Sequence, residues 1–511
     1  MSDWTDGYVA DIDYTFGYYT ELNPIRVKLA FLNAGLACPE MGTACELGFG
    51  QGMSANIHAA ASLTSWHGTD FNPSHAGFAQ ELATVSGSGA KLYDDAFADF
   101  AARSDLPDFD YIGLHGIWSW ISDDNRAVIV DFIRRKLKVG GLLYISYNTL
   151  PGWGAFAPIR HLMTKHAEVF GTDGKGIIDR IDGALEFTNR FIETNPIYLR
   201  SNPNIADRMK KIKAQNRNYL AHEYFNRDWH PMYFATMSDW LTPAKISYAC
   251  SAHYIDYVDS VNLTKEQSAF LKEIPDAVFR ESVRDFIINQ QFRRDYWVRG
   301  ARRISALERI DALRAVKVIL VSHRPDVSLK INVTLGEATM SGATYDPIFD
   351  LLADHKPKTI GQLEQAVKDR GVSLTHVIEA VLVMVNFGHL AAVQDDAVIS
   401  KAKKQTVKLN SYLINKARYN GEFSHLASPV TGGGIKVDRF QQLFLLAMSL
   451  GKKQPVEWAK FASDILDTQN QRIIKNGKAL ETPEENLQEL TIQAQFFADK
   501  QLPIMKELQV A

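Results

Sequence analysis

Hydrophobic positions in the first 150 residues switch between short continuous apolar runs and longer stretches with a helical repeat. The apolar runs predict strands over residues 66–71, around Leu92, and over residues 111–114 and 142–147. The helical repeat predicts helices over residues 53–63, 72–85 and 97–102, and a longer one from Arg126 through Leu137 that ends at Gly140 and Gly141. Because strands that alternate with helices form parallel sheets with right-handed crossovers, the pattern predicts an α/β fold with a mostly parallel sheet.

The pattern changes beyond residue 155, where the sequence is mainly helical up to about residue 315. A mixed linker follows over residues 328–344, and residues 346–393 read as two helices, a long apolar helix and a short wing. A glycine-rich turn over residues 427–437 precedes another helix. These changes predict four regions: residues 1–155, a largely helical 156–330, a winged-helix-like α/β part over 331–410, and a mixed region over 411–511.

A glycine-rich loop opens the first region, in the stretch ACELGFGQGMS, with Gly48, Gly50 and Gly52 spaced GxGxG. No lysine follows, which excludes a P-loop, and Met53 stands where a dinucleotide fingerprint needs its third glycine. A carboxylate at the mouth of the loop, Glu46, disfavours a phosphate. A cationic, phosphate-free ligand such as S-adenosylmethionine (SAM) fits better, and Asp70 at the end of the second strand can accept hydrogen bonds from its ribose hydroxyls.

This arrangement resembles the class I SAM-dependent methyltransferases, whose first motif reads E/DxGxGxG and whose second strand ends in an acid. The resemblance implies a Rossmann-like, doubly wound sheet over residues 1–155 that binds SAM. It implies that Asp95, with Ala96 beside it, is the acid that faces the adenine of the cofactor. It also implies that residues 109–122 form the segment where the methyl group meets its acceptor. The segment LKVGGLLYIS matches the family's LxPGG-strand pair except that Val139 replaces proline.

Candidate catalytic residues follow the fourth and fifth strands, residues 111–114 and 142–147, when the strand before the glycine loop is counted as the first. His115 and Trp118 lie after the fourth strand and Asn148 after the fifth. We prefer Trp118 over Trp120 as an aromatic wall for a cation. A core position for Trp118 and a packed role for His115 remain open. Tyr18 and Tyr19 are the preferred aromatic residues to cover the cofactor, and a mere packing role for their segment stays open.

Composition narrows the partners. The 511 residues hold 56 Lys and Arg against 59 Asp and Glu, so no basic excess favours nucleic acid. The segment after the fourth strand also lacks the (N/D/S)PP(Y/F) motif of adenine methyltransferases. Three cysteines without a CxxC pair argue against a zinc ribbon, and HEYFN over residues 222–226 lacks the second histidine of a zinc-protease helix, so no metal is expected. The start of the chain lacks the order of a secretory signal and no 18-residue apolar run occurs, so we expect a cytoplasmic protein without membrane insertion.

Three blocks outside the cofactor motifs resemble a narrower family: HGIWSW, HEYFNRDWHPMYF and ASPVTGGG. They are similar to segments of multidomain bacterial methyltransferases that carry a methyltransferase regulatory domain, among them the rickettsial-type lysine methyltransferases of outer-membrane proteins. The resemblance implies methyl transfer to lysine side chains of a surface protein, and a homodimer. Two alternatives stay open: a small-molecule methyltransferase, and a regulatory protein that binds SAM without methyl transfer.

Lysine chemistry constrains the first possibility. A lysine with a pKa near ~10.4 is protonated at neutral pH and cannot attack a methyl carbon. Desolvation between aromatic rings, together with a nearby sulfonium, would lower that pKa. No dedicated base is needed if water carries the proton away.

Overall fold

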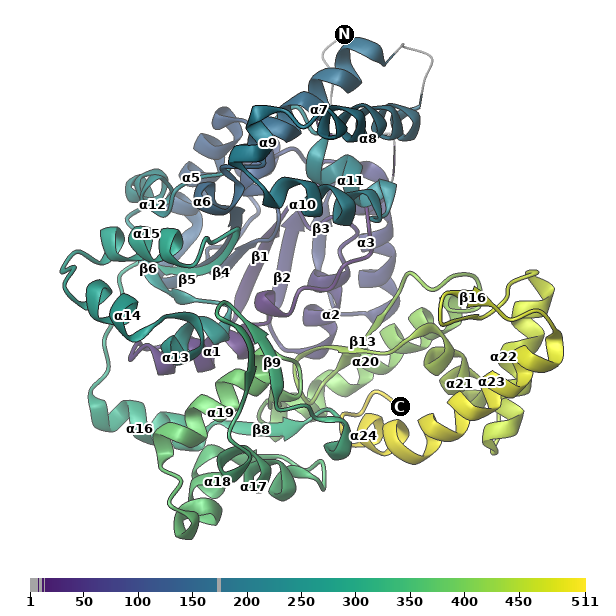
Figure 1. The fold of residues 1–511 in the computed structure, drawn as a ribbon. Coiled ribbons are helices and arrows are strands. Elements are labelled where there is room, and N and C mark those ends of the chain that lie inside the picture. The colour runs from purple at the N-terminus through teal and green to yellow at the C-terminus, as the bar shows by residue number, and fades with distance from the viewer. Residues whose placement is uncertain (1–7, 9–11, 13, 172–175) are drawn as a thin grey trace.

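A seven-stranded sheet occupies the first 300 residues, in the order β3-β2-β1-β4-β5-β7-β6 (Figure 1). The computed structural model describes Tyr8, Ile12 and residues 14–171 and 176–511. Neighbouring strands pair parallel except at β7, which runs antiparallel to both β5 and β6. The α/β, mostly parallel, Rossmann-like fold is confirmed. Its strands are β1 (Thr43–Leu47), β2 (Ser65–Thr69), β3 (Lys91–Tyr93), β4 (Phe109–Leu114), β5 (Leu137–Asn148), β6 (Ser247–Ser251) and β7 (Phe292–Val298).

Alternate side chains of these strands enter two different hydrophobic cores, as the two-residue period of a strand requires. Ala44, Trp66 and Tyr144 belong to one core, which α1 (Pro24–Asn33), α2 (Met53–Ala61) and α3 (Pro73–Ser86) cover. Cys45 and Ile145 belong to the other, which α4 (Phe97–Ala102), α5 (Asp123–Lys136) and α12 (Phe234–Leu241) cover. Both faces of the sheet are therefore buried, as in other doubly wound folds.

The boundary between α5 and β5 differs from the sequence prediction. The helix ends at Lys136, and Leu137 already pairs with Phe109 as the first residue of β5. The register then shifts so that Leu142 pairs with Tyr111, and Gly140 lies in the shifted stretch with a φ of 82°. The prediction that the helix reaches Gly140 and Gly141 is wrong because this glycine pair accommodates an irregularity within a strand.

Strands β6 and β7 come from the region predicted to be largely helical. Tyr296 of β7 pairs with Tyr144 of β5, so this region completes the sheet of the first one. Figure 1 shows α7 to α11 above the sheet, beyond the carboxyl ends of its parallel strands. The helices of the region are α6 (Leu150–Trp153), α7 (Ala157–Phe170), α8 (Ile177–Glu193), α9 (Ile197–Ser201), α10 (Asn204–Lys213), α11 (Arg217–Tyr224), α12, α13 (Asp259–Asn262), α14 (Lys265–Lys272) and α15 (Ala277–Ile287).

A small antiparallel sheet, in the order β11-β8-β12, follows α16 (Ala306–Ala315). The three helices expected from residues 346–393 are α17 (Gly342–Leu352), α18 (Ile360–Val367) and α19 (Leu374–Asn386). The middle strand of the sheet is β8, which precedes these helices, and α20 (Asp396–Lys416) follows β12 closely. The strands of this part are β8 (Lys317–Leu320), β9 (Lys330–Val333), β10 (Gly336–Thr339), β11 (Lys358–Thr359) and β12 (Leu390–Ala392).

The glycine-rich turn predicted over residues 427–437 is the hairpin of β13 (His425–Ser428) and β14 (Gly433–Lys436). This hairpin and α20 contact α2, the helix that follows the glycine-rich loop. No helix in the described part of the chain is long and apolar enough to span a bilayer. The remaining elements are α21 (Arg439–Ser449), α22 (Pro455–Thr468), β15 (Ile474–Lys475), β16 (Lys478–Ala479), α23 (Pro483–Phe496) and α24 (Leu502–Glu507).

Candidate functional site

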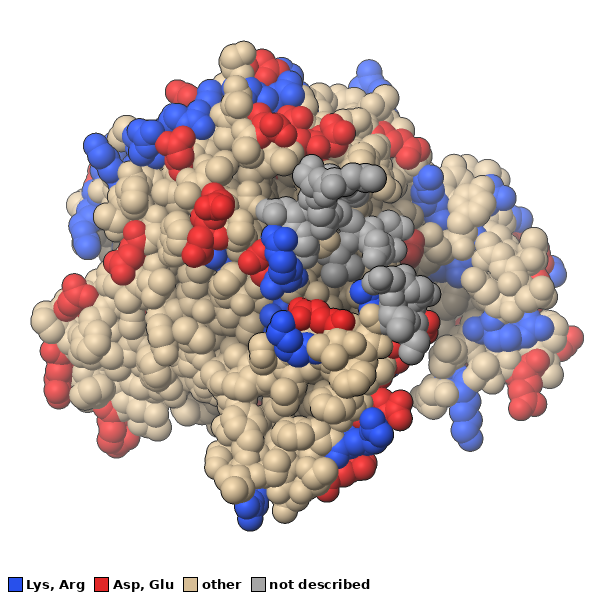
Figure 2. All heavy atoms as spheres, turned by 90° about the horizontal axis from the view of Figure 1, so that it is seen from above, with Lys and Arg blue, Asp and Glu red and all other residues tan. Residues whose placement is uncertain are grey.

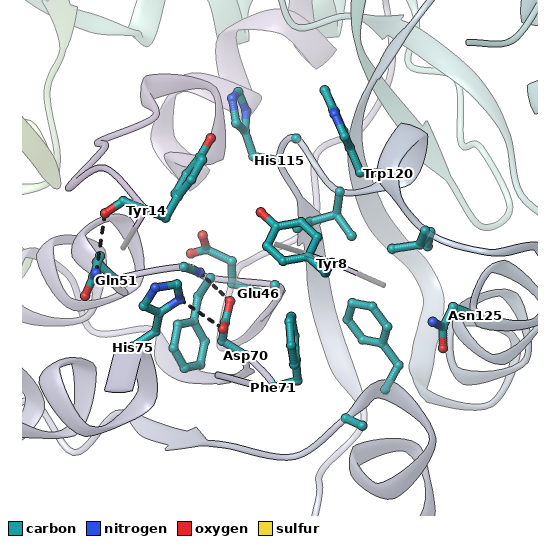
Figure 3. Close-up of a pocket in the computed structure, with 18 of the residues that line it drawn as sticks. Tyr8, Tyr14, Glu46, Gln51, Asp70, Phe71, His75, His115, Trp120 and Asn125 are labelled. Atoms are coloured by element: carbon teal, nitrogen blue, oxygen red, sulfur yellow. Dashed lines mark hydrogen bonds and ion pairs between the residues drawn. The ribbon is translucent and has the colours of Figure 1, made fainter. Parts of the chain in front are cut away.

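A pocket lies at the carboxyl ends of β1 to β4, where doubly wound folds bind their ligands (Figure 3). The loop after β1, the acid after β2 and the segments after β3 and β4 each contribute to its lining. Residues 14–22, here named the N-terminal arm, form a further wall through Tyr14, Thr15, Gly17 and Tyr19. The pocket thus joins most of the predicted cofactor residues in one place: Glu46, Gly48, Gly50, Asp70, Asp95 and Ala96.

The glycine loop takes the backbone conformation that its sequence suggests. Gly48, Gly50 and Gly52 have φ values of 69°, 57° and 70°, a left-handed region that other residues rarely adopt. A Cβ on Gly48 would collide with Ile117 of the opposite wall. Gly52 lies outside the lining, immediately before α2, where a Cβ would stand 2.5 Å from the Cβ of Ala79. Gly48 and Gly50 therefore shape the pocket, whereas Gly52 permits α2 and α3 to approach.

Three donors hold the carboxylate of Asp70. The backbone N–H of Gly50 donates to Oδ2 at 2.8 Å, and the N–H of Asn72 donates to Oδ1 at 3.1 Å. Nδ1 of His75 lies 3.3 Å from Oδ1. His75 lines the pocket, is buried, and leaves Nε2 without a hydrogen-bond partner in the described structure. The sequence reasoning missed His75, although its position in the first turn of α3, five residues after Asp70, places it at the same edge.

Glu46 is the most strongly perturbed acid in the pocket. Burial, and secondarily the nearby charge of Asp70, raises the pKa of its carboxyl to about 8. Its Oε2 is buried and has no hydrogen-bond partner among the described residues. A buried carboxyl without a partner is costly, so this position suits a ligand that supplies a positive charge or hydrogen-bond donors.

The segment after β3 carries Asp95 and Ala96 into the lining. Arg103 donates to Oδ2 of Asp95 at 3.1 Å, and the hydroxyl of Thr69 donates to its backbone oxygen. Ala96 is the residue before α4. Both lie where the resemblance to methyltransferases expects the adenine edge.

His115 forms part of the wall opposite the glycine loop. Its ring stacks on Tyr19 of the N-terminal arm with centroids 3.7 Å apart, and Nδ1 lies 2.8 Å from the hydroxyl of Tyr144. Burial lowers the pKa of His115 to about 4, so the imidazole is neutral at physiological pH. A neutral ring held on two sides is a rigid wall rather than a charge carrier.

Trp118 does not line the pocket. Residues Trp118–Trp120 form a short 3-10 helix instead of an extended segment. Trp118 is fully buried, donates from Nε1 to Sδ of Met232 at 3.3 Å and packs edge-on against Trp240. Trp120 does line the pocket, and its Nε1 donates to the backbone oxygen of Glu223 at 3.2 Å. The structure thus corrects our preference for Trp118 as the aromatic wall: within the 3-10 turn Trp120 faces the pocket, whereas Trp118 enters the hydrophobic core.

Asn148 and Tyr18 also lie outside the lining. Asn148, at the end of β5, donates its backbone N–H to Oγ of Ser119, and its buried Nδ2 has no partner among the described residues. Tyr18 points away from the pocket and hydrogen-bonds Nε2 of His58 on α2 at 3.1 Å. The tyrosines of the arm that face the pocket are Tyr14 and Tyr19.

The block HEYFNRDWHPMYF contributes Asp228 to the lining of the pocket. Nε2 of His230 lies 3.3 Å from the carboxylate of Asp228. His222 contacts the rings of Tyr8 and Tyr14. Among the residues that the structure describes, no group of three or more His, Cys, Asp or Glu side chains is placed to hold a metal ion.

Known proteins are similar to this chain in sequence and in fold. Residues 216–299 match the family described as a predicted methyltransferase regulatory domain. The uncharacterized Synechocystis sp. protein sll1526 is 40% identical over 513 residues, which span 99% of this chain and 100% of that protein. Rickettsia prowazekii RP789 is 26% identical over 292 residues, 55% of this chain and 51% of its own length.

Two solved structures of PKMT2 from Rickettsia typhi share the fold over nearly the whole chain. The complex with AdoHcy has a TM-score of 0.69 at 18% identity and covers 98% of this chain and 100% of that one. The other structure has a TM-score of 0.67 at 19% identity, with 96% and 99% covered. Fold and site together define a protein with the SAM-dependent methyltransferase fold and a methyltransferase regulatory domain. The chain belongs to the same family as Synechocystis sll1526.

Proposed function

We propose that this protein is a SAM-dependent methyltransferase that methylates lysine side chains of a bacterial surface protein. The observation that carries the proposal is the convergence of Glu46, Asp70 and Asp95, from the ends of three strands, around a left-handed glycine loop. The fold shared with PKMT2, whose structure contains AdoHcy, supports the same cofactor at this edge.

The pocket residues fit SAM group by group. Asp70, already oriented by Gly50 and Asn72, would accept the ribose hydroxyls. Glu46, with an unpartnered buried oxygen, would take the ammonium group. Asp95 and Ala96 would meet the adenine edge. When bound, SAM supplies a methyl group on a positively charged sulfur, and the protein need only position and desolvate the acceptor.

An aromatic wall favours an amine acceptor. Tyr14, Tyr19, His115 and Trp120 line the pocket beyond the glycine loop. Such a wall excludes water from a lysine amine, which lowers its pKa and frees the lone pair that attacks the methyl carbon. A pose that holds amine and methyl group in line supplies further rate enhancement. We assign His115 to this wall, where its neutral ring adds no repulsion to an approaching ammonium.

The wider proposal concerns partners and domains. Figure 2 looks onto the molecule from above, and positive and negative side chains are interspersed over that face, with no single positive field of the kind that phosphates require. This pattern supports a protein acceptor over nucleic acid. A cytoplasmic location, a homodimer and a winged-helix-like fold for residues 331–410 belong to the same proposal. So does the division into regions 1–155, 156–330, 331–410 and 411–511, of which the first two share one sheet.

Calorimetric titration with S-adenosylhomocysteine tests the cofactor. Asp70→Ala should weaken binding at least about tenfold, because buried ribose hydroxyls would lose their acceptor. Asp99→Ala, an exposed acid on α4, is the matched control and should bind like the unaltered protein. Equal affinity of the Asp70 variant and the unaltered protein would refute the cofactor assignment.

Incubation with methyl-tritiated SAM and a lysate of the source bacterium tests the acceptor. We expect a labelled protein band that disappears with Asp70→Ala, followed by mass spectrometry of its lysines. Label confined to small molecules would favour the second candidate, a small-molecule methyltransferase in which the later regions shape the pocket. Binding without any label would favour a regulatory protein that only holds SAM.

A further inference from the structure

We propose that the C-terminal hairpin of β13 and β14 is a positioning element of the cofactor pocket and acts through Tyr18 and its neighbour Tyr19. The inference rests on the proposed function and extends it to residues more than 400 positions away in sequence. It gives the ASPVTGGG block, which contributes no side chain to the pocket, a physical role.

The N-terminal arm has two sides. Tyr14, Gly17 and Tyr19 face the pocket, whereas Phe16 and Tyr18 face the C-terminal region. Phe16 packs edge-on against Phe423 with centroids 4.7 Å apart. The ring of Tyr18 lies 4.9 Å from that of His425 at the start of β13.

The hairpin approaches Tyr18 closely at two glycines. A Cβ on Gly433 would stand 2.5 Å from both the Tyr18 hydroxyl and Nδ2 of Asn23. A Cβ on Gly434 would stand 3.0 Å from three atoms of the Tyr18 ring. Neither glycine has a left-handed φ. Backbone conformation does not require glycine at these two positions. The close approach of Tyr18, joined at Gly433 by Asn23, accounts for the missing side chains.

Two polar contacts tie the same hairpin to the end of the arm and to α2. Nδ2 of Asn23, the residue that caps α1, donates to the backbone oxygen of Thr431 at 3.1 Å. Nε2 of Gln394 donates both to Pro429 in the hairpin turn and to Ala61 at the end of α2, at 2.6 and 2.7 Å. The hairpin is therefore held against the start of α1, which follows the arm, and against the end of α2, which follows the glycine loop.

Tyr19 transmits this placement to the pocket. It follows Tyr18 directly, its N–H donates to Oγ of Ser54 on α2 at 2.9 Å, and its ring stacks on His115. A displacement of Tyr18 must move the adjacent backbone, and the stack of Tyr19 on His115 depends on that backbone. The hairpin thereby sets the position of the wall that the cofactor and acceptor would meet.

Gly433→Ala is the test, with S-adenosylhomocysteine as the probe in calorimetric titration. The added methyl group should displace the Tyr18 hydroxyl and weaken binding about fivefold, the amount expected from loss of one aromatic stack. Gly421→Ala, in the same region but against Arg439 only, is the matched control and should leave affinity unchanged.

Two double variants separate positioning from general damage. Tyr18→Phe in the Gly433→Ala background removes one of the two colliding groups, the hydroxyl, and leaves Nδ2 of Asn23 in place, so it should restore part of the affinity. The double variant Tyr19→Ala with Gly433→Ala should bind the probe as strongly as Tyr19→Ala alone. Once the Tyr19 ring is gone, the change at Gly433 has no route to the pocket. A full additional loss, or unaltered affinity of Gly433→Ala, would overturn the inference.

Hydrogen exchange of the ligand-free protein keeps this test independent of the proposed function. Amides of residues 14–22 should exchange faster in Gly433→Ala than in Gly421→Ala. If the unaltered protein fails to bind the probe, the proposed function falls, and equal exchange rates in the two variants would then refute the positioning role as well.

Discussion

We expect Glu46 to couple ligand binding to proton release. Its pKa of about 8 means that the free protein carries a proton on this carboxyl at pH 7. If the ammonium of the cofactor pairs with the carboxylate, binding must expel that proton. Affinity for S-adenosylhomocysteine should therefore rise by up to about tenfold per pH unit below pH 8 and level off above it.

Calorimetry in two buffers with different ionisation enthalpies measures this release directly. We expect nearly one proton per bound ligand at pH 7. Glu46→Gln keeps the shape of the side chain and should release none, and its affinity should lose most of the pH dependence. Equal release in both proteins would place the titrating group elsewhere.

Substitution of the two tryptophans after β4 should have different effects, one on the stability of the protein and the other on ligand binding or activity. Trp118→Ala empties a fully buried position and should lower the free energy of unfolding by about 3–5 kcal/mol. Trp120→Ala, on the pocket wall, should mainly reduce affinity or methyl transfer. Urea denaturation and calorimetric titration of both variants measure the two effects, and a reversed pattern would contradict the placement of these rings.

At the residue scale, the sequence predicts those site residues that local spacing along the chain places at a strand end. Acids and glycines next to a strand end are found from spacing, so Glu46, Gly48, Gly50 and Asp70 could be placed before the structure was known. His75 and Asp228 could not, because their proximity depends on how α3 and the segment after α11 return to the sheet. The predicted position of Trp118 on the pocket wall was wrong because apolar spacing does not distinguish a short 3-10 turn from an extended segment.

Strand β7 shows why two of the seven strands escaped sequence analysis. Its buried side chains include Arg293 and Asp295, so the usual apolar alternation of a strand is broken. Arg293 donates to Asp285 at 2.6 Å, to Asp295 at 2.8 Å and to Glu281 at 3.0 Å. These three acids compensate the charge of Arg293 and allow it to be buried inside the protein. In β1 to β5 the buried acid is Glu46, at the pocket end of β1, and the apolar runs beside it remain recognisable in the sequence.

This cluster gives a prediction about the element. Arg293→Ala would leave Asp285 and Asp295 buried without their cation and should lower the free energy of unfolding by about 3–5 kcal/mol. Arg302→Ala, at an exposed position just beyond β7, is the control and should change it little. Urea denaturation followed by circular dichroism compares the two variants. An unchanged midpoint for Arg293→Ala would mean that the cluster contributes nothing to stability.

The whole molecule should not fold in the pieces that the sequence divides it into. Residues 1–155 alone would expose the edge of β5 that β7 covers along its length from Leu142 to Asn148. Open hydrophobic strand edges associate with one another. We expect a 1–155 fragment to aggregate or stay unfolded, whereas a 1–330 fragment, which retains β6 and β7, should be the more soluble of the two. Expression and analytical size exclusion of both fragments test this expectation.

The placement of β7 also has a consequence during synthesis. The strand that covers the second edge of β5 is encoded about 150 residues downstream, so at typical translation speeds a nascent chain carries a central strand with one unpaired edge for roughly 8–30 s. Through this interval the ribosome has already released the glycine loop and its acids, yet the sheet that supports them is incomplete. Slow codons or a depleted chaperone pool over residues 150–290 should therefore reduce the yield of active protein more than the same disturbance placed after residue 300.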